Sequence, residues 1–168
     1  MVPCLHLNTH NPLEWNEAFF FRWGQIIGQS HECTTSYLFW RKAEALAPKE
    51  PPTQIHDWND EWQSFNEWCQ EDVVRERWHE IRNQLAKLPI EPNSYGLIHN
   101  DPHLWNILVE GSRLTLIDFD LAGYHWFMMD LGIAIYTALC LAKPEPTVDF
   151  NQYTTAFLKS FLGGYRTT

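Results

Sequence analysis

The feature that most constrains this chain is a polar segment set inside an apolar run, IHNDPHLWNIL at residues 98–108. Two histidines, two asparagines and an aspartate stand there between residues that belong in a hydrophobic core. Buried polar groups need hydrogen-bond partners. We therefore expect the apolar residues to anchor this segment in the core while its polar side chains face a cleft. A shorter segment of the same kind, LIDFDLAG, follows at residues 116–123.

The surrounding sequence predicts a mainly helical chain with one small β-hairpin. Apolar residues at helical spacing predict one helix capped by Asn11 and running to about residue 34, and a second, long helix over 57–88. Residues 106–109 and 114–118 favour two strands joined by a tight turn. Further helices are expected over 127–142 and from about residue 149, the last ended by Gly163 and Gly164. The expected fold class is α+β, mostly α, in a single domain over residues 1–168.

Composition limits the partners of the chain. A formal net charge of −9 disfavours nucleic acid and anionic membranes, and a neutral or cationic substrate is expected instead. The most apolar run, residues 131–142, is shorter than the ~18 residues that a membrane span requires. Four cysteines without CxxC pairing, and a first segment unlike a signal peptide, predict reduced thiols and a cytoplasmic location.

Three oxygen-bearing side chains carry the predicted chemistry. Asp101 and Asn106 lie five residues apart, and Asp118 follows the expected hairpin. A loop and a hairpin end can bring the three to one point, where two carboxylates and an amide oxygen suit Mg²⁺. A carboxylate that does not bind the metal could orient a hydroxyl and accept its proton, as phosphoryl transfer requires.

The segment HNDPHLWN at 99–106, followed after one hairpin by IDFD at 117–120, resembles the catalytic and metal-binding motifs of the aminoglycoside phosphotransferase and choline kinase family. Residues 23–37 and 119–136 are also similar to segments of that family, and the likeness is closest to its bacterial stress-response kinases. The resemblance implies the helical C-terminal lobe of a protein-kinase-like fold, with the hairpin carrying the metal-binding aspartate. It also implies ATP and Mg²⁺ as cofactors and a small-molecule hydroxyl, or a protein Ser or Thr, as acceptor.

The same resemblance implies roles for individual residues. Asp101 would be the catalytic base and His99 would support the loop. Asn106 and Asp118 would bind Mg²⁺ and, through it, the nucleotide, while Asp120 would be a second metal or substrate contact.

Two further residues have weaker assignments. His103 would lie on the phosphate side of the cofactor. Asp130 would hold the backbone of the catalytic loop from the following helix, although an N-cap of that helix is an equally good local interpretation.

The glycine-rich loop and strand lysine of kinase N-terminal lobes are missing from this sequence. The expectation is therefore a C-terminal lobe with little activity alone, completed by a separate N-terminal lobe or acting as a homodimer. Two alternatives remain open. One is a non-catalytic binding module, and the other is a metal-dependent hydrolase in which His99, Asp101 and His103 bind zinc.

Overall fold

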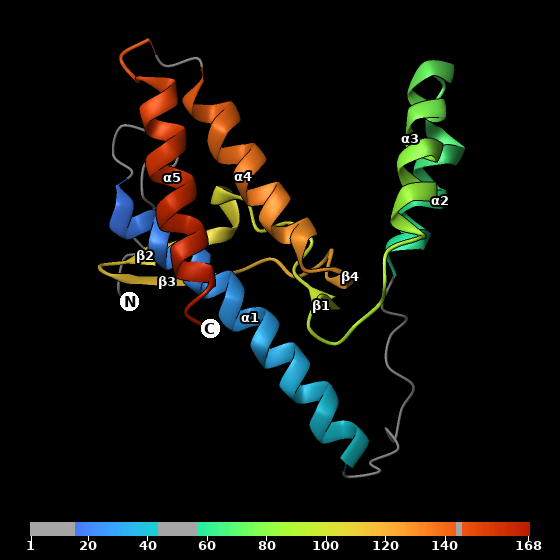
Figure 1. Cartoon of the computed structure of the whole chain (residues 1–168), viewed down its shortest axis with the longest axis horizontal. Helices are drawn as coiled ribbons and strands as arrows, with labels where there is room; N and C mark the ends of the chain where they lie inside the picture. The colour runs from blue at the N-terminus through green and yellow to red at the C-terminus, as the bar shows by residue number, and fades with distance from the viewer. Residues whose placement is uncertain (1–15, 44–56, 144–145) are drawn as a thin grey trace.

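The computed structural model describes residues 16–43, 57–143 and 146–168. Helices α1 (Glu17–Ala43), α4 (Met128–Ala142) and α5 (Phe150–Tyr165) form the main body, and α2 (Trp58–Trp68) and α3 (Asp72–Leu85) stand to one side of it (Figure 1). Short strands β1 (Tyr95–Ile98), β2 (Ile107–Glu110), β3 (Arg113–Leu116) and β4 (Gly123–Trp126) complete this part of the chain. The expected mostly helical α+β class is confirmed.

The core forms where α1 crosses α4 and α5. Aromatic side chains dominate it, and Trp23, Phe157 and Phe161 are fully buried, with Trp23 lying 5.5 Å from Phe161 between ring centroids. Burial of each such aromatic side chain contributes roughly 2–3 kcal/mol. From α4, Leu131 and two alanines are buried in this core, and larger apolar side chains of the same helix pack against it partly buried: Ile135, Leu139 and Leu141. Among the described helices, none is both long enough and apolar enough to cross a membrane.

Glycines allow α1 and α5 to touch backbone to backbone. A Cβ added at Gly24 would lie 1.9 Å from the Phe161 carbonyl oxygen, and one added at Gly164 would lie 1.8 Å from the Phe21 carbonyl oxygen. The prediction that Gly163 and Gly164 end the last helix is wrong, because α5 continues to Tyr165. Close helix approach, and not termination, is the physical role of Gly164.

The strands form two separate antiparallel pairs. The expected hairpin is confirmed as β2 paired with β3, with Ile107 opposite Leu116. The second pair, β1 with β4, places Ile98 opposite Gly123. The segment containing β4 was not expected to be a strand, because its residues show no clear alternation of apolar and polar side chains.

The predicted single helix over 57–88 is instead two helices. Cys69 has an extended backbone with ψ 118°, and α3 folds back so that Trp78 stacks on Trp62 at 3.8 Å and on Phe65 at 3.9 Å. The apolar spacing continues in register across this break, so periodicity alone could not reveal it. Asp57 caps α2 by accepting from the backbone N–H groups of Asn59 and Asp60.

The start of the first helix was placed at Asn11, which lies outside the described residues. In the described part, the Asn16 side chain accepts the Phe19 N–H at 3.0 Å where α1 begins. The Asp149 side chain likewise accepts from Asn151 and Gln152, which confirms the predicted start of α5.

The glycine contacts give a stability prediction with a matched control. Gly164→Ala should destabilise the fold by about 1–3 kcal/mol, because the methyl group would push α5 off α1. Gly163→Ala should be neutral or stabilising by up to ~1 kcal/mol, since its Cβ would meet nothing closer than 4.0 Å. Urea unfolding of both variants measures the difference. Equal stabilities would show that the helices do not approach this closely.

Candidate functional site

The polar segment forms a loop between β1 and β2, and the hydrophobic core anchors one side of this loop. Pro102 and Leu104 are buried, and the indole N–H of Trp23 in α1 donates to the Pro102 carbonyl oxygen at 3.3 Å. The short 3-10 turn η2 (Leu104–Asn106) then leads into β2. Apolar residues therefore fix the loop in the core, as the sequence indicated, while the Asp101 side chain remains 30% exposed.

Asp130 holds the backbone of this loop from α4. Its carboxylate is fully buried and accepts the His99 N–H at 3.0 Å and the Asn100 N–H at 2.7 Å. Asn100 has a φ of 65°, a left-handed conformation that asparagine tolerates better than most residues. Asp130 makes no capping bond to its own helix. The loop-bracing interpretation is therefore confirmed over the N-cap interpretation.

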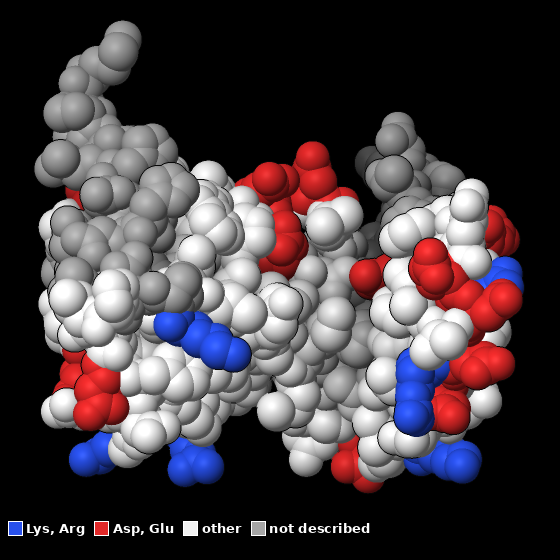
Figure 2. All heavy atoms as spheres, turned by 90° about the horizontal axis from the view of Figure 1, so that it is seen from above, with Lys and Arg blue, Asp and Glu red and all other residues white. Residues whose placement is uncertain are grey.

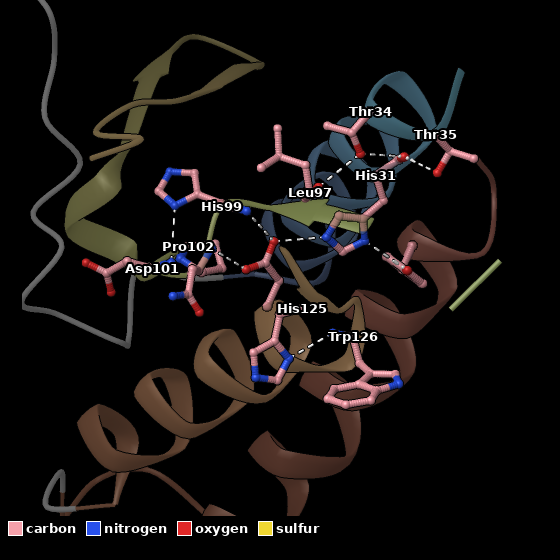
Figure 3. A network of polar contacts seen from close by, with 12 residues as sticks. His31, Thr34, Thr35, Leu97, His99, Asp101, Pro102, His125 and Trp126 are labelled. Atoms are coloured by element: carbon pink, nitrogen blue, oxygen red, sulfur yellow. Dashed lines mark hydrogen bonds and ion pairs between the residues drawn. The ribbon is translucent and has the colours of Figure 1, made fainter. Parts of the chain in front are cut away.

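His31 of α1 links the same carboxylate to α5. Its Nε2 lies 2.9 Å from Asp130 Oδ2, and its Nδ1 lies 3.0 Å from the Tyr165 hydroxyl (Figure 3). A carboxylate can only accept, so Nε2 carries the hydrogen and Nδ1 can accept from Tyr165. Burial, and to a lesser extent the Asp130 carboxylate, raises the pKa of Tyr165, so its hydroxyl remains protonated and can donate. The ring of Phe127 stacks on His31 at 4.4 Å.

The His99 ring connects the loop to the segment that follows the hairpin. Its Nε2 donates to the Ile117 carbonyl oxygen at 2.9 Å, and its Nδ1 accepts the Asp101 N–H at 3.3 Å. Both ring nitrogens are therefore used inside the protein, and the residue is fully buried. This position agrees with the expected supporting role of His99.

Asp101, His103 and Asn106 meet at one carboxylate oxygen. Asn106 donates its amide N–H to Asp101 Oδ2 at 3.2 Å and to the Asp101 carbonyl oxygen at 2.9 Å. His103 Nε2 lies 3.3 Å from the same Oδ2. In Figure 3 the Asp101 carboxylate points away from the buried network around His99. The predicted proximity of Asp101 and Asn106 is thus observed.

Asp118 lies beyond the hairpin of β2 and β3, one residue after a backbone hydrogen bond to this cluster. The Ile117 N–H donates to the Asn106 carbonyl oxygen at 3.0 Å, which places the backbones of these two segments side by side. Asp118 has a φ of 66° and is exposed, as is Asp120. A left-handed non-glycine residue costs of order 1 kcal/mol, and such strain is typical of functional sites. Metal binding by Asp118 and Asp120 remains a prediction.

The geometry argues against the zinc hydrolase alternative. His99 has no free ring nitrogen to offer a metal, since one is bonded to a carbonyl oxygen and the other to a backbone N–H. Among the described residues, no group of three or more His, Cys, Asp or Glu side chains could hold a metal ion. The proposed ligand trio of His99, Asp101 and His103 is therefore not assembled.

Two residues of this framework escaped the sequence analysis. The sequence assigned His31 no role, yet it is 3% exposed and bonded at both nitrogens. A signal was present, because Trp23, Ile27 and His31 follow one another at helical spacing on the buried face of α1. The second residue that the sequence analysis missed is Asn100, whose side-chain N–H donates to Glu61 of α2 at 3.0 Å.

Comparison with known proteins now identifies the family. The model of the phosphotransferase enzyme family, APH, matches residues 9–165. The chain belongs to this family. The amicoumacin kinase of Bacillus subtilis (strain 168) is 30% identical over 155 residues, which are 90% of this chain and 43% of that protein. The predicted likeness to stress-response kinases remains a prediction.

A solved structure agrees with this assignment. An amicoumacin kinase in complex with AMP-PNP, Ca²⁺ and Ami has a TM-score of 0.79 and 29% sequence identity, over 99% of this chain and 47% of that chain. A microcompartment-associated aminopropanol kinase is less similar, with a TM-score of 0.47 and 20% identity. The chain therefore spans less than half the length of the amicoumacin kinases that it matches.

The buried carboxylate gives a second prediction. Asp130→Asn should destabilise the fold by about 3–5 kcal/mol, because the new amide N–H groups would face N–H donors in a buried site. Asp72→Asn is the matched control, since Asp72 is exposed and, among the described residues, forms an ion pair with Arg75 of the same helix alone, an interaction of at most ~1 kcal/mol. Denaturant unfolding measures both. A loss below ~1 kcal/mol in Asp130→Asn would contradict the bracing role.

Proposed function

We propose that this chain carries the acceptor-binding and metal-binding half of an ATP-dependent phosphotransferase that acts on a hydroxyl group of a small molecule. Residues 1–168 would form one helical lobe of a kinase-like fold. The observation that carries the proposal is the arrangement of Asp101. Its Oδ2 accepts a hydrogen bond from Asn106 and lies 3.3 Å from His103 Nε2, and among the described residues no hydrogen bond falls on Oδ1.

In the proposed mechanism Asp101 is the general base. Its free Oδ1 would accept the proton of the acceptor hydroxyl as that oxygen attacks the γ-phosphorus. Geometry is the main requirement, because an oriented hydroxyl reacts far faster than a freely diffusing one. The loop that carries Asp101 is fixed by the Asp130 carboxylate and by Trp23, so the base would need little rearrangement on binding.

The residues present fit a divalent cation. The side-chain nitrogen of Asn106 donates to Asp101, so the side-chain oxygen Oδ1 of Asn106 faces away from that carboxylate. This oxygen could act as a hard ligand for the cation. The exposed Asp118 carboxylate would be the second ligand and Asp120 a further contact. When bound, Mg²⁺ would neutralise charge on the transferring phosphoryl group. The AMP-PNP and Ca²⁺ bound by the related amicoumacin kinase support this assignment.

Acidic residues beside the loop favour a cationic acceptor. Glu61 reaches from α2 to the Asn100 side chain, one residue before Asp101. Exposed Asp and Glu side chains also gather over α2 and α3, interspersed with Arg side chains (Figure 2). One Glu61 oxygen bonds to Asn100, so the other could bind an ammonium group of an amino alcohol. A serine or threonine of a basic protein segment is the second acceptor class.

Nucleotide binding by this chain alone is expected to be weak. The sequence has no glycine-rich loop, and a nucleotide-binding lobe, on this or another polypeptide, would supply the missing phosphate contacts. A stable lobe that binds partners without catalysis is therefore the alternative function. Magnesium-dependent nucleotide binding distinguishes the two, because only the phosphotransferase requires it.

The first functional prediction concerns the base. Asp101→Asn should lower phosphate transfer from ATP to a panel of amino alcohols by roughly 10²–10⁴-fold and leave Mg²⁺-dependent AMP-PNP binding unchanged. Asp72→Asn should behave like the wild type. Transfer by the unmodified chain should be slow, and ordinary turnover would contradict that expectation. A folded chain that shows neither transfer nor nucleotide binding would favour the binding module.

The acceptor site gives a separate prediction. Glu61→Gln should raise the KM for a cationic amino alcohol about tenfold, because one charge-assisted contact is lost, and should leave the KM for a neutral alcohol unchanged. Glu67→Gln makes the same charge change on an exposed position of the same helix and should have no effect. Steady-state kinetics with paired acceptors measures this. Equal effects of the two substitutions would reject Glu61 as an acceptor contact.

A further inference from the structure

The surroundings of His103 favour a different role from the expected one on the phosphate side of the cofactor. Its Nε2 lies 3.3 Å from Asp101 Oδ2, within ion-pair distance. Its Nδ1 is buried and has no hydrogen-bond partner among the described residues. The polar group nearest to Nε2 is therefore the Asp101 carboxylate, and Nδ1 is not accessible to a nucleotide.

The His103 backbone is held beside Asp101 and Asn106. Its N–H donates to the Asp101 carbonyl oxygen at 2.9 Å, and its carbonyl oxygen accepts the Asn106 N–H at 3.0 Å. The Trp105 ring packs against the imidazole edge to face, with centroids 5.2 Å apart. These contacts place the imidazole next to the Asp101 carboxylate.

We infer that His103 is a positioning residue that anchors one oxygen of the Asp101 carboxylate, and not a ligand of the nucleotide phosphates. Since a carboxylate only accepts, the hydrogen on the imidazole would lie on Nε2, facing Oδ2. Asn106 donates a hydrogen bond to the same oxygen. The Asn106 hydrogen bond and the His103 contact on Oδ2 would together restrict rotation of the carboxylate and leave Oδ1 for the acceptor. This inference rests on the proposed function only for the identity of Asp101 as the base.

Nitrogen NMR tests the contact without requiring catalysis. In the ¹⁵N-labelled full chain at one fixed pH, His103 should show a protonated Nε2 and an unprotonated Nδ1. The preference should disappear in Asp101→Ala, while exposed His79 on α3 should be unaffected by that substitution. A hydrogen on Nδ1, or an equal mixture of both tautomers in the unmodified chain, would overturn the inference.

Two substitutions at position 103 then separate positioning from phosphate binding. His103→Gln keeps an N–H close to the position of Nε2, whereas His103→Leu removes it. The Leu variant should lower kcat about 10- to 100-fold with nucleotide and acceptor KM values within twofold, and the Gln variant should recover most of the loss. A tenfold weaker binding of Mg²⁺–AMP-PNP in the Leu variant, with no recovery by Gln, would instead identify a phosphate ligand.

The NMR and kinetic experiments can reject the proposed function and the His103 inference separately. If the full chain transfers no phosphate but His103 shows the Asp101-dependent Nε2 tautomer, the proposed function fails and the anchoring contact stands. If phosphate is transferred but the tautomer does not depend on Asp101, the inference about His103 fails and the proposed function stands. His79→Leu serves as the control for loss of a histidine, because His79 lies exposed on α3 and should change neither readout.

Discussion

The buried carboxylate of Asp130 is the interaction on which the rest of this structure depends. An ionised group without solvent is destabilising by several kcal/mol unless its oxygens are fully bonded. Here the bonds come from the loop at His99 and Asn100 and from His31 in α1. The carboxylate therefore cannot be satisfied unless α1, α4 and the loop occupy their final places together. One local requirement thus sets the position of the loop that carries Asp101, the proposed base, in a body built mostly from helices.

The sequence was most informative where polar residues interrupt an apolar pattern. The loop at 98–108, the hairpin of β2 and β3 and the helix α4 were all expected close to their observed positions. In these segments the local pattern and the tertiary structure agree. Leu104 and Ile107 are buried on the core side of the loop, so Asp101 faces the opposite side. The proximity of Asp101 and Asn106 was predictable for the same reason, since both lie on one short turn.

Features determined by contacts between distant segments were not predictable. The break at Cys69 depends on the stacking of Trp78 against Trp62, and no glycine or proline marks it. The role of Gly164 depends on the Phe21 backbone of a helix far away in sequence. His31 became part of the site through Asp130, and one histidine on a helix gives no sign of its partner. Each case needs a spatial neighbour that one-dimensional periodicity does not contain.

The helical pair α2 and α3 joins the main body through a small set of contacts. Asp57 bridges to Tyr124, Trp58 packs against Trp126, and Glu61 bonds to Asn100. None of these involves the Asp130 carboxylate or the core between α1 and α5. Substitutions in the pair therefore leave the bonds of Asp130 and that core in place. If the pair contributes to acceptor binding as proposed, changes in it would alter which alcohol is bound without moving the loop that carries Asp101, and one scaffold could then serve many compounds.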